Sequence, residues 1–103
     1  MASGAPPGVR EIVVELSNRH GLHLRPATRF AQEAMRFRSE VRVSANGQEV
    51  NGKSILMLTS LAAERGTRLA LRAEGEDAAE CLAALEALVR SRFGEEDPPA
   101  RGG

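Results

Sequence analysis

The sequence predicts an α+β fold of the split βαβ type with one additional helix, in the order βαββαβα. Two patterns predict it. Some segments place apolar residues at every second position, as strands with one buried face do, and others repeat them every three or four positions, as amphipathic helices do. Because the expected strands are half polar, we expect one face of the sheet to lie under the helices and the other to meet water.

The first half of the chain predicts a strand, a helix and a β-hairpin. Alternating apolar residues indicate strands over 12–16 and 41–45, and apolar residues at helical spacing indicate a helix over 24–37. The dipeptide Asn46-Gly47 predicts a two-residue hairpin turn, followed by a short strand through Val50. The residues expected to face the core here are Ile12, Val14, Leu16, Ala27, Phe30, Ala31, Ala34, Val41, Val43 and Ala45.

The second half predicts two more helices with a strand between them. Ser54 can cap a helix over 55–64, and alternation predicts a strand over 69–73. Asp77, with a glutamate three positions later, predicts the start of the last helix, which Gly94 ends. The residues expected to face the core in these two helices are Ile55, Leu58, Leu61, Ala62, Ala78, Cys81, Leu82, Leu85 and Val89.

The composition predicts one domain and argues against some partners. The 103 residues suffice for a single core, which we expect over 10–94, between mobile tails at 1–9 and 95–103. With 14 basic and 14 acidic residues and no Trp or Tyr, the chain lacks the basic excess and the stacking platform of a nucleic-acid binder.

Cysteine content and hydropathy predict the compartment. The single cysteine, Cys81, excludes an intramolecular disulfide and is expected to act as a small core residue. No apolar run is long enough to span a bilayer, and residues 1–8 lack the features of a signal peptide. We therefore expect a cytoplasmic protein without membrane insertion.

The candidate functional residue is His23, in the run Gly21-Leu22-His23-Leu24-Arg25-Pro26-Ala27. Pro26 fits the first turn of a helix, where a missing N–H costs nothing, so His23 is expected at or just before the N-cap. There, unpaired backbone amides and the positive end of the helix dipole face an anion on the ring. Arg25 adds a planar cation that suits phosphate oxygens. Together these features predict a site that accepts a phosphoryl group.

This run resembles the active-site signature of HPr, the histidine-containing phosphocarrier of the bacterial phosphotransferase system. The segment Asn51-Gly52-Lys53-Ser54-Ile55 is similar to the regulatory serine region of that family, and the match covers roughly residues 10–93. Leu24 departs from the family, which usually has Ala, Thr or Ser there. The resemblance implies the HPr-like open-faced β-sandwich, a four-stranded antiparallel sheet covered on one face by three helices.

The resemblance also implies a function. His23 would accept a phosphoryl group from enzyme I, with Nδ1 the favoured nitrogen, and pass it to IIA components of the sugar phosphotransferase system. Arg25 would stabilise the phosphate. No cofactor or metal is implied, because each partner enzyme brings its own machinery. The protein would be a substrate of enzymes more than an independent catalyst.

Ser54 and several apolar residues are further candidates. By resemblance, a Ser-specific HPr kinase would phosphorylate Ser54 beside Lys53, which adds about two negative charges to the docking surface. A transcriptional regulator is then a further implied partner. Apolar residues beyond the buried stripe suggest docking, the alternative being a wider core-facing stripe. The candidate docking residues are Leu24, Thr28, Ile55, Leu56 and Met57.

Two alternatives stay open beside the carrier function. One is a regulatory HPr-like protein, of the nitrogen-related branch or a Ser-phosphorylated co-regulator, that controls partners by binding. The other is a metal- or ligand-binding module that uses His20 and His23, although no Cys, Asp or Glu with ligand-like spacing accompanies the pair. We expect a monomer, because the apolar residues suffice for one core only.

Overall fold

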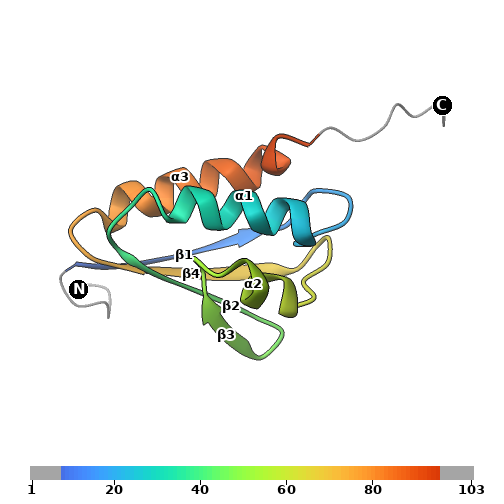
Figure 1. The fold of residues 1–103 in the computed structure, drawn as a ribbon, viewed down its shortest axis with the longest axis horizontal. Coiled ribbons are helices and arrows are strands. Elements are labelled where there is room, and N and C mark those ends of the chain that lie inside the picture. Colours follow the sequence, from blue (N-terminus) through green and yellow to red (C-terminus); the bar gives the residue numbers. More distant parts are fainter. Residues whose placement is uncertain (1–7, 96–103) are drawn as a thin grey trace.

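The computed structural model describes residues 8–95 and confirms the expected order of elements (Figure 1). Four strands form one antiparallel sheet in the order β1-β4-β2-β3, and three helices pack with it around one core. The strands are β1 (Val9–Glu15), β2 (Glu40–Ala45), β3 (Gln48–Asn51) and β4 (Arg68–Glu74). The helices are α1 (Leu24–Ala34), α2 (Ile55–Ser60) and α3 (Ala78–Arg90), and a 3-10 turn η1 (Arg92–Gly94) follows α3.

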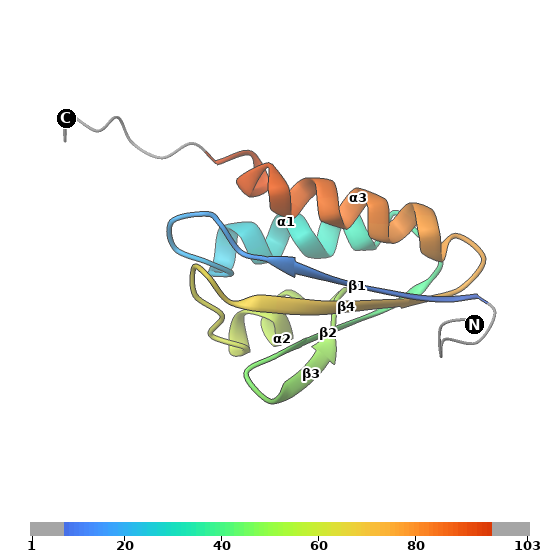
Figure 2. The ribbon, with the colours of Figure 1, turned by 180° about the vertical axis from the view of Figure 1, so that it is seen from behind.

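The sheet pairs strands that are far apart in the sequence. β1 pairs with β4 from Val9 opposite Glu74 to Glu15 opposite Arg68, and β2 lies on the other side of β4. The hairpin between β2 and β3 turns at Asn46-Gly47, where both residues have positive φ, as the expected two-residue turn requires. Figure 2 shows α1 and α3 lying side by side over the same face of the sheet.

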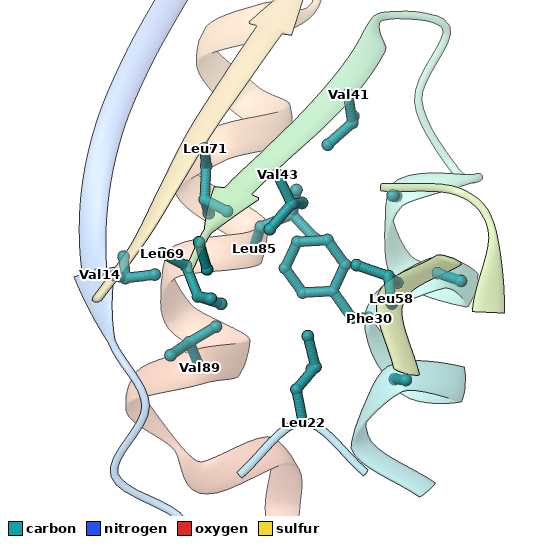
Figure 3. Close-up of a cluster of buried hydrophobic side chains, with 14 of the residues drawn as sticks. Val14, Leu22, Phe30, Val41, Val43, Leu58, Leu69, Leu71, Leu85 and Val89 are labelled. Carbon is teal, nitrogen blue, oxygen red and sulfur yellow. The ribbon is translucent and has the colours of Figure 1, made fainter. Parts of the chain in front are cut away.

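The core lies between the helices and the inward face of the sheet. Phe30 of α1 is fully buried among valine and leucine side chains from the strands and the other two helices (Figure 3). The opposite face carries charged residues such as Arg42 and Glu49, which are exposed. The structure therefore confirms the open-faced sandwich, with one dry and one wet face.

Two helices are shorter than the sequence predicts. α1 ends at Ala34 instead of residue 37, and α2 ends at Ser60 instead of residue 64. The prediction that Ala62 faces the core is wrong: it is exposed and has a left-handed φ of 52°. This turn buries Ala63 instead and aims its carbonyl at the amide of Leu22, which donates to it at 2.8 Å.

Asp77 precedes α3 as expected but does not cap it through its side chain. Its carboxylate instead accepts hydrogen bonds from the amides of Arg38 and Ser39, at 2.9 and 3.0 Å, and from the Ser39 hydroxyl at 2.5 Å. The Ser39 hydroxyl, followed by the Arg38 amide, holds the pKa of Asp77 below its ordinary value of 3.8. The carboxylate thus ties the turn after α1 to the start of α3.

Cys81 is a buried core residue, as predicted. Burial raises the pKa of its thiol to about 11, and the nearby Asp77 carboxylate adds to this shift. The side chain is therefore a neutral thiol at physiological pH, which fits packing and not nucleophilic chemistry.

The loop between β1 and α1 packs tightly against the segment after α2. Gly21 has a φ of 66°, and a Cβ at this position would lie 2.3 Å from the carbonyl oxygen of Ala63. The next side chain, Leu22, is buried in the core (Figure 3). Gly21, which has no side chain, thus allows the loop to lie this close to the main chain of Ala63 and Glu64.

The ends of the folded part differ slightly from the expected boundaries. Val9 begins β1 and is buried, and Glu95 is placed beside the start of α1, so the structure extends one residue beyond 10–94 at each end. The rest of the expected tails, 1–7 and 96–103, lies outside the described residues. Among residues 8–95, no helix is long and apolar enough to cross a membrane.

Asp77→Asn should lower the free energy of unfolding at pH 7, and the loss should shrink as the pH falls. Because the folded pKa of Asp77 lies below its ordinary value, the carboxylate contributes its full stabilisation above that ordinary value and loses it as the pH falls through the folded pKa. Urea unfolding at several pH values between 7 and 2.5 measures this, with Glu76→Gln as the neighbouring control. A loss of stability in Asp77→Asn that stays constant down to the lowest pH would contradict the lowered pKa of Asp77.

Gly21→Ala should destabilise the fold more than Gly47→Ala. Both glycines have positive φ, so both substitutions carry a left-handed cost of about 1–2 kcal/mol. Only Gly21 would bring a methyl group into backbone, whereas nothing lies within 4 Å of a Cβ at Gly47. The urea midpoints of the two variants measure the stability that each loses. Equal losses would contradict the prediction, because they would show that the backbone around Gly21 moves aside for a methyl group without cost.

Candidate functional site

His23 is the N-cap of α1, as the sequence predicts. Its backbone is extended, with φ −79° and ψ −171°, and its side chain makes no capping hydrogen bond. The imidazole is 43% exposed, while the preceding Leu22 and the following Pro26 and Ala27 are buried. The chain therefore fixes the backbone on both sides of His23 and leaves its ring accessible.

The first turn of α1 has two backbone amides without a partner among residues 8–95. Pro26 has no N–H, and the amide of Ala27 already donates to the His23 carbonyl at 2.9 Å. The amides of Leu24 and Arg25 make no hydrogen bond within the described part of the chain. Because helix N-termini carry partial positive charge, these two donors form a site for an anion next to the His23 ring.

An open hollow of about 720 Å³ lies over this turn. Neither Arg25 nor Arg29, both of which line it, has an ion-pair partner within residues 8–95. Two guanidinium groups in a shallow, open depression suit a phosphate or a similar anion. The lining residues are His23, Leu24, Arg25, Thr28, Arg29 and Gln32.

A group of residues that sequence reasoning did not bring together lies on the Nε2 side of His23. The Glu95 carboxylate lies 3.8 Å from that nitrogen, and the buried Asn18 donates from Nδ2 to Glu95 at 3.3 Å and to the Gly21 carbonyl at 2.7 Å. The sequence predicts Glu95 in a mobile tail, because nothing in its local sequence indicates order. The apolar Phe93, two positions earlier, is the feature that could have indicated order here, because it is buried in the structure.

His20 lies next to His23, with ring centroids 5.5 Å apart and planes at 83°. This edge-to-face arrangement is typical of aromatic pairs. Within residues 8–95, no group of three or more His, Cys, Asp or Glu side chains is arranged to hold a metal ion.

Ser54 is the N-cap of α2, as predicted, and its Oγ accepts a hydrogen bond from the amide of Met57 at 3.1 Å. The neighbouring Lys53 makes its hydrogen bond away from Ser54. The Lys53 ammonium donates to the carbonyl of Phe37 at 2.8 Å, which ties the segment before α2 to the turn after α1. The Ser54 side chain itself is only partly buried.

The candidate docking residues divide into exposed and partly buried ones. Leu24, Leu56 and Met57 are 65%, 78% and 42% exposed, so they do not belong to the core stripe. Ile55 packs against the core, and Thr28 is half-buried and donates its hydroxyl to the Leu24 carbonyl at 2.8 Å. α1 and α2 pack against each other, so the exposed leucines and Met57 come from two neighbouring helices.

Comparisons with known proteins agree with this geometry. Residues 10–91 match the family model described as the PTS HPr component phosphorylation site. The phosphocarrier protein HPr of Neisseria meningitidis serogroup A is 46% identical over 82 residues, which cover 80% of this chain and 92% of that protein.

Solved structures are also similar. The crystal structure of HPr-C-His from Thermoanaerobacter tengcongensis has a TM-score of 0.82 and 42% identity over 85% of this chain and 99% of that one. The catabolite repression protein Crh of Bacillus subtilis, described as a swapped, intertwined dimer, has a TM-score of 0.65 and 47% identity over 77% of this chain and 91% of that one. The chain therefore belongs to the HPr family of the phosphotransferase system.

Proposed function

We propose that His23 accepts a phosphoryl group from enzyme I and passes it to IIA components of the sugar phosphotransferase system. The observation that supports this most directly is the placement of an exposed imidazole at a helix N-cap beside two unpaired amides. The two arginines of the open hollow add to it. The protein is then a carrier in the cytoplasm, and enzyme I and the IIA components provide the catalysis.

The chemistry of the transfer follows from these groups. A ring nitrogen of His23, proposed as Nδ1, attacks phosphorus with its lone pair while the bond from phosphorus to the donor breaks and its electrons return to the donor. Charge on the phosphoryl oxygens is stabilised by the amides of Leu24 and Arg25 and by the Arg25 guanidinium. The open hollow lets a partner approach in line, and the same step in reverse releases the group to an acceptor.

The surface around His23 supports docking of both partners through one patch. Leu24, Leu56 and Met57 expose apolar area, and Met adapts to different contacts. Arg25 and Arg29 add positive charge, so we propose partner surfaces with an apolar centre and acidic groups around it. Thr28 and Ile55 support this patch from partly buried positions. We propose that the protein acts as a monomer, with β1 paired inside its own sheet.

We also propose that Ser54 is a regulatory phosphorylation site for a Ser-specific HPr kinase. A phosphate here would still accept the hydrogen bond from the Met57 amide, and it would place negative charge beside the exposed Leu56 and Met57. Acidic partner surfaces would then be repelled. The similarity to Crh favours a second candidate function, in which the Ser54-phosphorylated form binds a transcriptional regulator and controls it without feeding sugar transport.

His23→Ala should abolish phosphorylation by enzyme I and phosphoenolpyruvate, because it removes the acceptor nitrogen. Intact-mass analysis is expected to show one acid-labile phosphoryl group on the wild type and none on the variant. His20→Ala, which keeps the acceptor, is the matched control and should still be phosphorylated. A folded wild type that a cognate enzyme I leaves unmodified would rule out the carrier function.

Ser54→Asp should slow phosphoryl transfer from enzyme I about 10-fold, which corresponds to about 1.4 kcal/mol of lost docking energy. Ser54→Ala should transfer at the wild-type rate while losing about 1 kcal/mol of stability through the missing cap. Gln48→Asp, on the exposed strand β3, adds the same charge away from the patch. Timed phosphoryl-transfer assays compare the rates of these three variants. Equal rates for Ser54→Asp and Gln48→Asp would refute the assignment of Ser54 to the docking surface.

A further inference from the structure

The chain after α3 reverses through a strained turn. Arg92 and Phe93 both have a φ of 58°, and Gly94 follows with a φ of 74°. Two consecutive non-glycine residues with left-handed backbone strain the chain here. The Phe93 side chain is fully buried, which holds the turn in place. A Cβ at Gly94 would lie 3.3 Å from the Arg29 guanidinium, so the turn passes close to α1.

This turn places Glu95 against the functional loop. The carboxylate is only 21% exposed, and its two oxygens face different partners: Oε1 accepts from Asn18 Nδ2 at 3.3 Å, and Oε2 lies 3.8 Å from His23 Nε2. Asn18 is itself buried and bonded to the Gly21 carbonyl, while its Oδ1 has no partner within the described residues. The amide that holds Glu95 is therefore part of the loop that positions His23.

The position of the carboxylate distinguishes the two tautomers of His23. At 3.8 Å a negative oxygen is attracted by an N–H on Nε2 and repelled by a lone pair there. A neutral ring beside Glu95 is therefore favoured with its proton on Nε2 and its lone pair on Nδ1. The sequence alone does not choose between the two nitrogens, whereas this contact favours Nδ1 as the nitrogen with the lone pair.

We infer that Glu95 is a positioning residue that holds the His23 imidazole in the tautomer whose Nδ1 accepts the phosphoryl group. This inference rests on the proposed carrier function and deepens it. Asn18 donates a hydrogen bond to the carboxylate, and the strained turn at 92–94 places Glu95 beside the ring. The site then comprises two halves, the start of α1 for the phosphate and the C-terminal turn for the far side of the ring.

The transfer balances without moving a proton. The Nδ1 lone pair forms the N–P bond, the donor leaves with the electrons of its own bond to phosphorus, and the ring keeps its proton on Nε2. The ring is then a cation, which the adjacent Glu95 carboxylate stabilises. When the group moves to an acceptor, the N–P electrons return to Nδ1 and restore the same neutral tautomer.

The test measures the tautomer directly. Proteins with ¹⁵N-labelled histidine are compared by NMR at pH 9, above the ordinary titration range of histidine. In the wild type the Nε2–H form of His23 is expected to predominate strongly. In Glu95→Ala and in Glu95→Gln, which removes the charge but keeps an acceptor for Asn18, its share should fall toward that of histidine in an unstructured peptide. Glu49→Ala, which removes an exposed carboxylate from β3, should leave the share unchanged.

A second readout is the rate of phosphoryl transfer from enzyme I, which should fall 3- to 10-fold in both Glu95 variants. An unchanged His23 tautomer in folded Glu95→Ala would overturn the inference even if the wild type is a working carrier. Conversely, absence of wild-type phosphorylation would refute the carrier function, while the tautomer measurement would still decide whether Glu95 positions the ring.

Discussion

One close contact between backbones determines the geometry of the functional site. Gly21 lies against Ala63 and Glu64, where any side chain would collide with main-chain atoms. The Leu22 amide bonds to the Ala63 carbonyl, and the Leu22 side chain enters the core. Since Leu22 is held inside and α1 begins immediately afterwards, His23 must stand at the helix start with its ring outside.

The consequences of this placement extend to the function. Pro26 and Ala27 are buried and Phe30 lies in the centre of the core, so α1 cannot shift without disturbing the whole interior. The amides at its N-terminus therefore keep a fixed direction. A fixed donor set in an open hollow suits a carrier, because the group must be held without being enclosed.

Much of the fold could be predicted because it depends on local patterns. Alternation, helical spacing and cap residues predict three strands and the three α-helices in the correct order, and Asn46-Gly47 predicts the hairpin and its second strand. His23 and Ser54 were recognised as N-caps because capping depends on residues within one turn. The roles of these residues in chemistry stay predictions, since they depend on phosphorylation and on partners.

The remaining features depend on contacts between distant parts of the chain. Asp77 looked like a helix cap, yet its carboxylate binds Ser39, 38 positions earlier. Ala62 matched a helical stripe, but the tie between Ala63 and Leu22 turns the chain there. Glu95 lies beside Asn18 across a separation of 77 residues, and no local pattern reports such a contact. In each case tertiary hydrogen bonds overrode local propensity.

The central claim is that the start of α1 holds the phosphoryl group on His23. Amide spectra of ¹⁵N-labelled protein, before and after phosphorylation by enzyme I, test it directly. We predict that the amide protons of Leu24 and Arg25 shift downfield more than any others, as expected for new hydrogen bonds to phosphoryl oxygens. Phosphorylation of His23 that leaves both amide resonances in place would contradict the account.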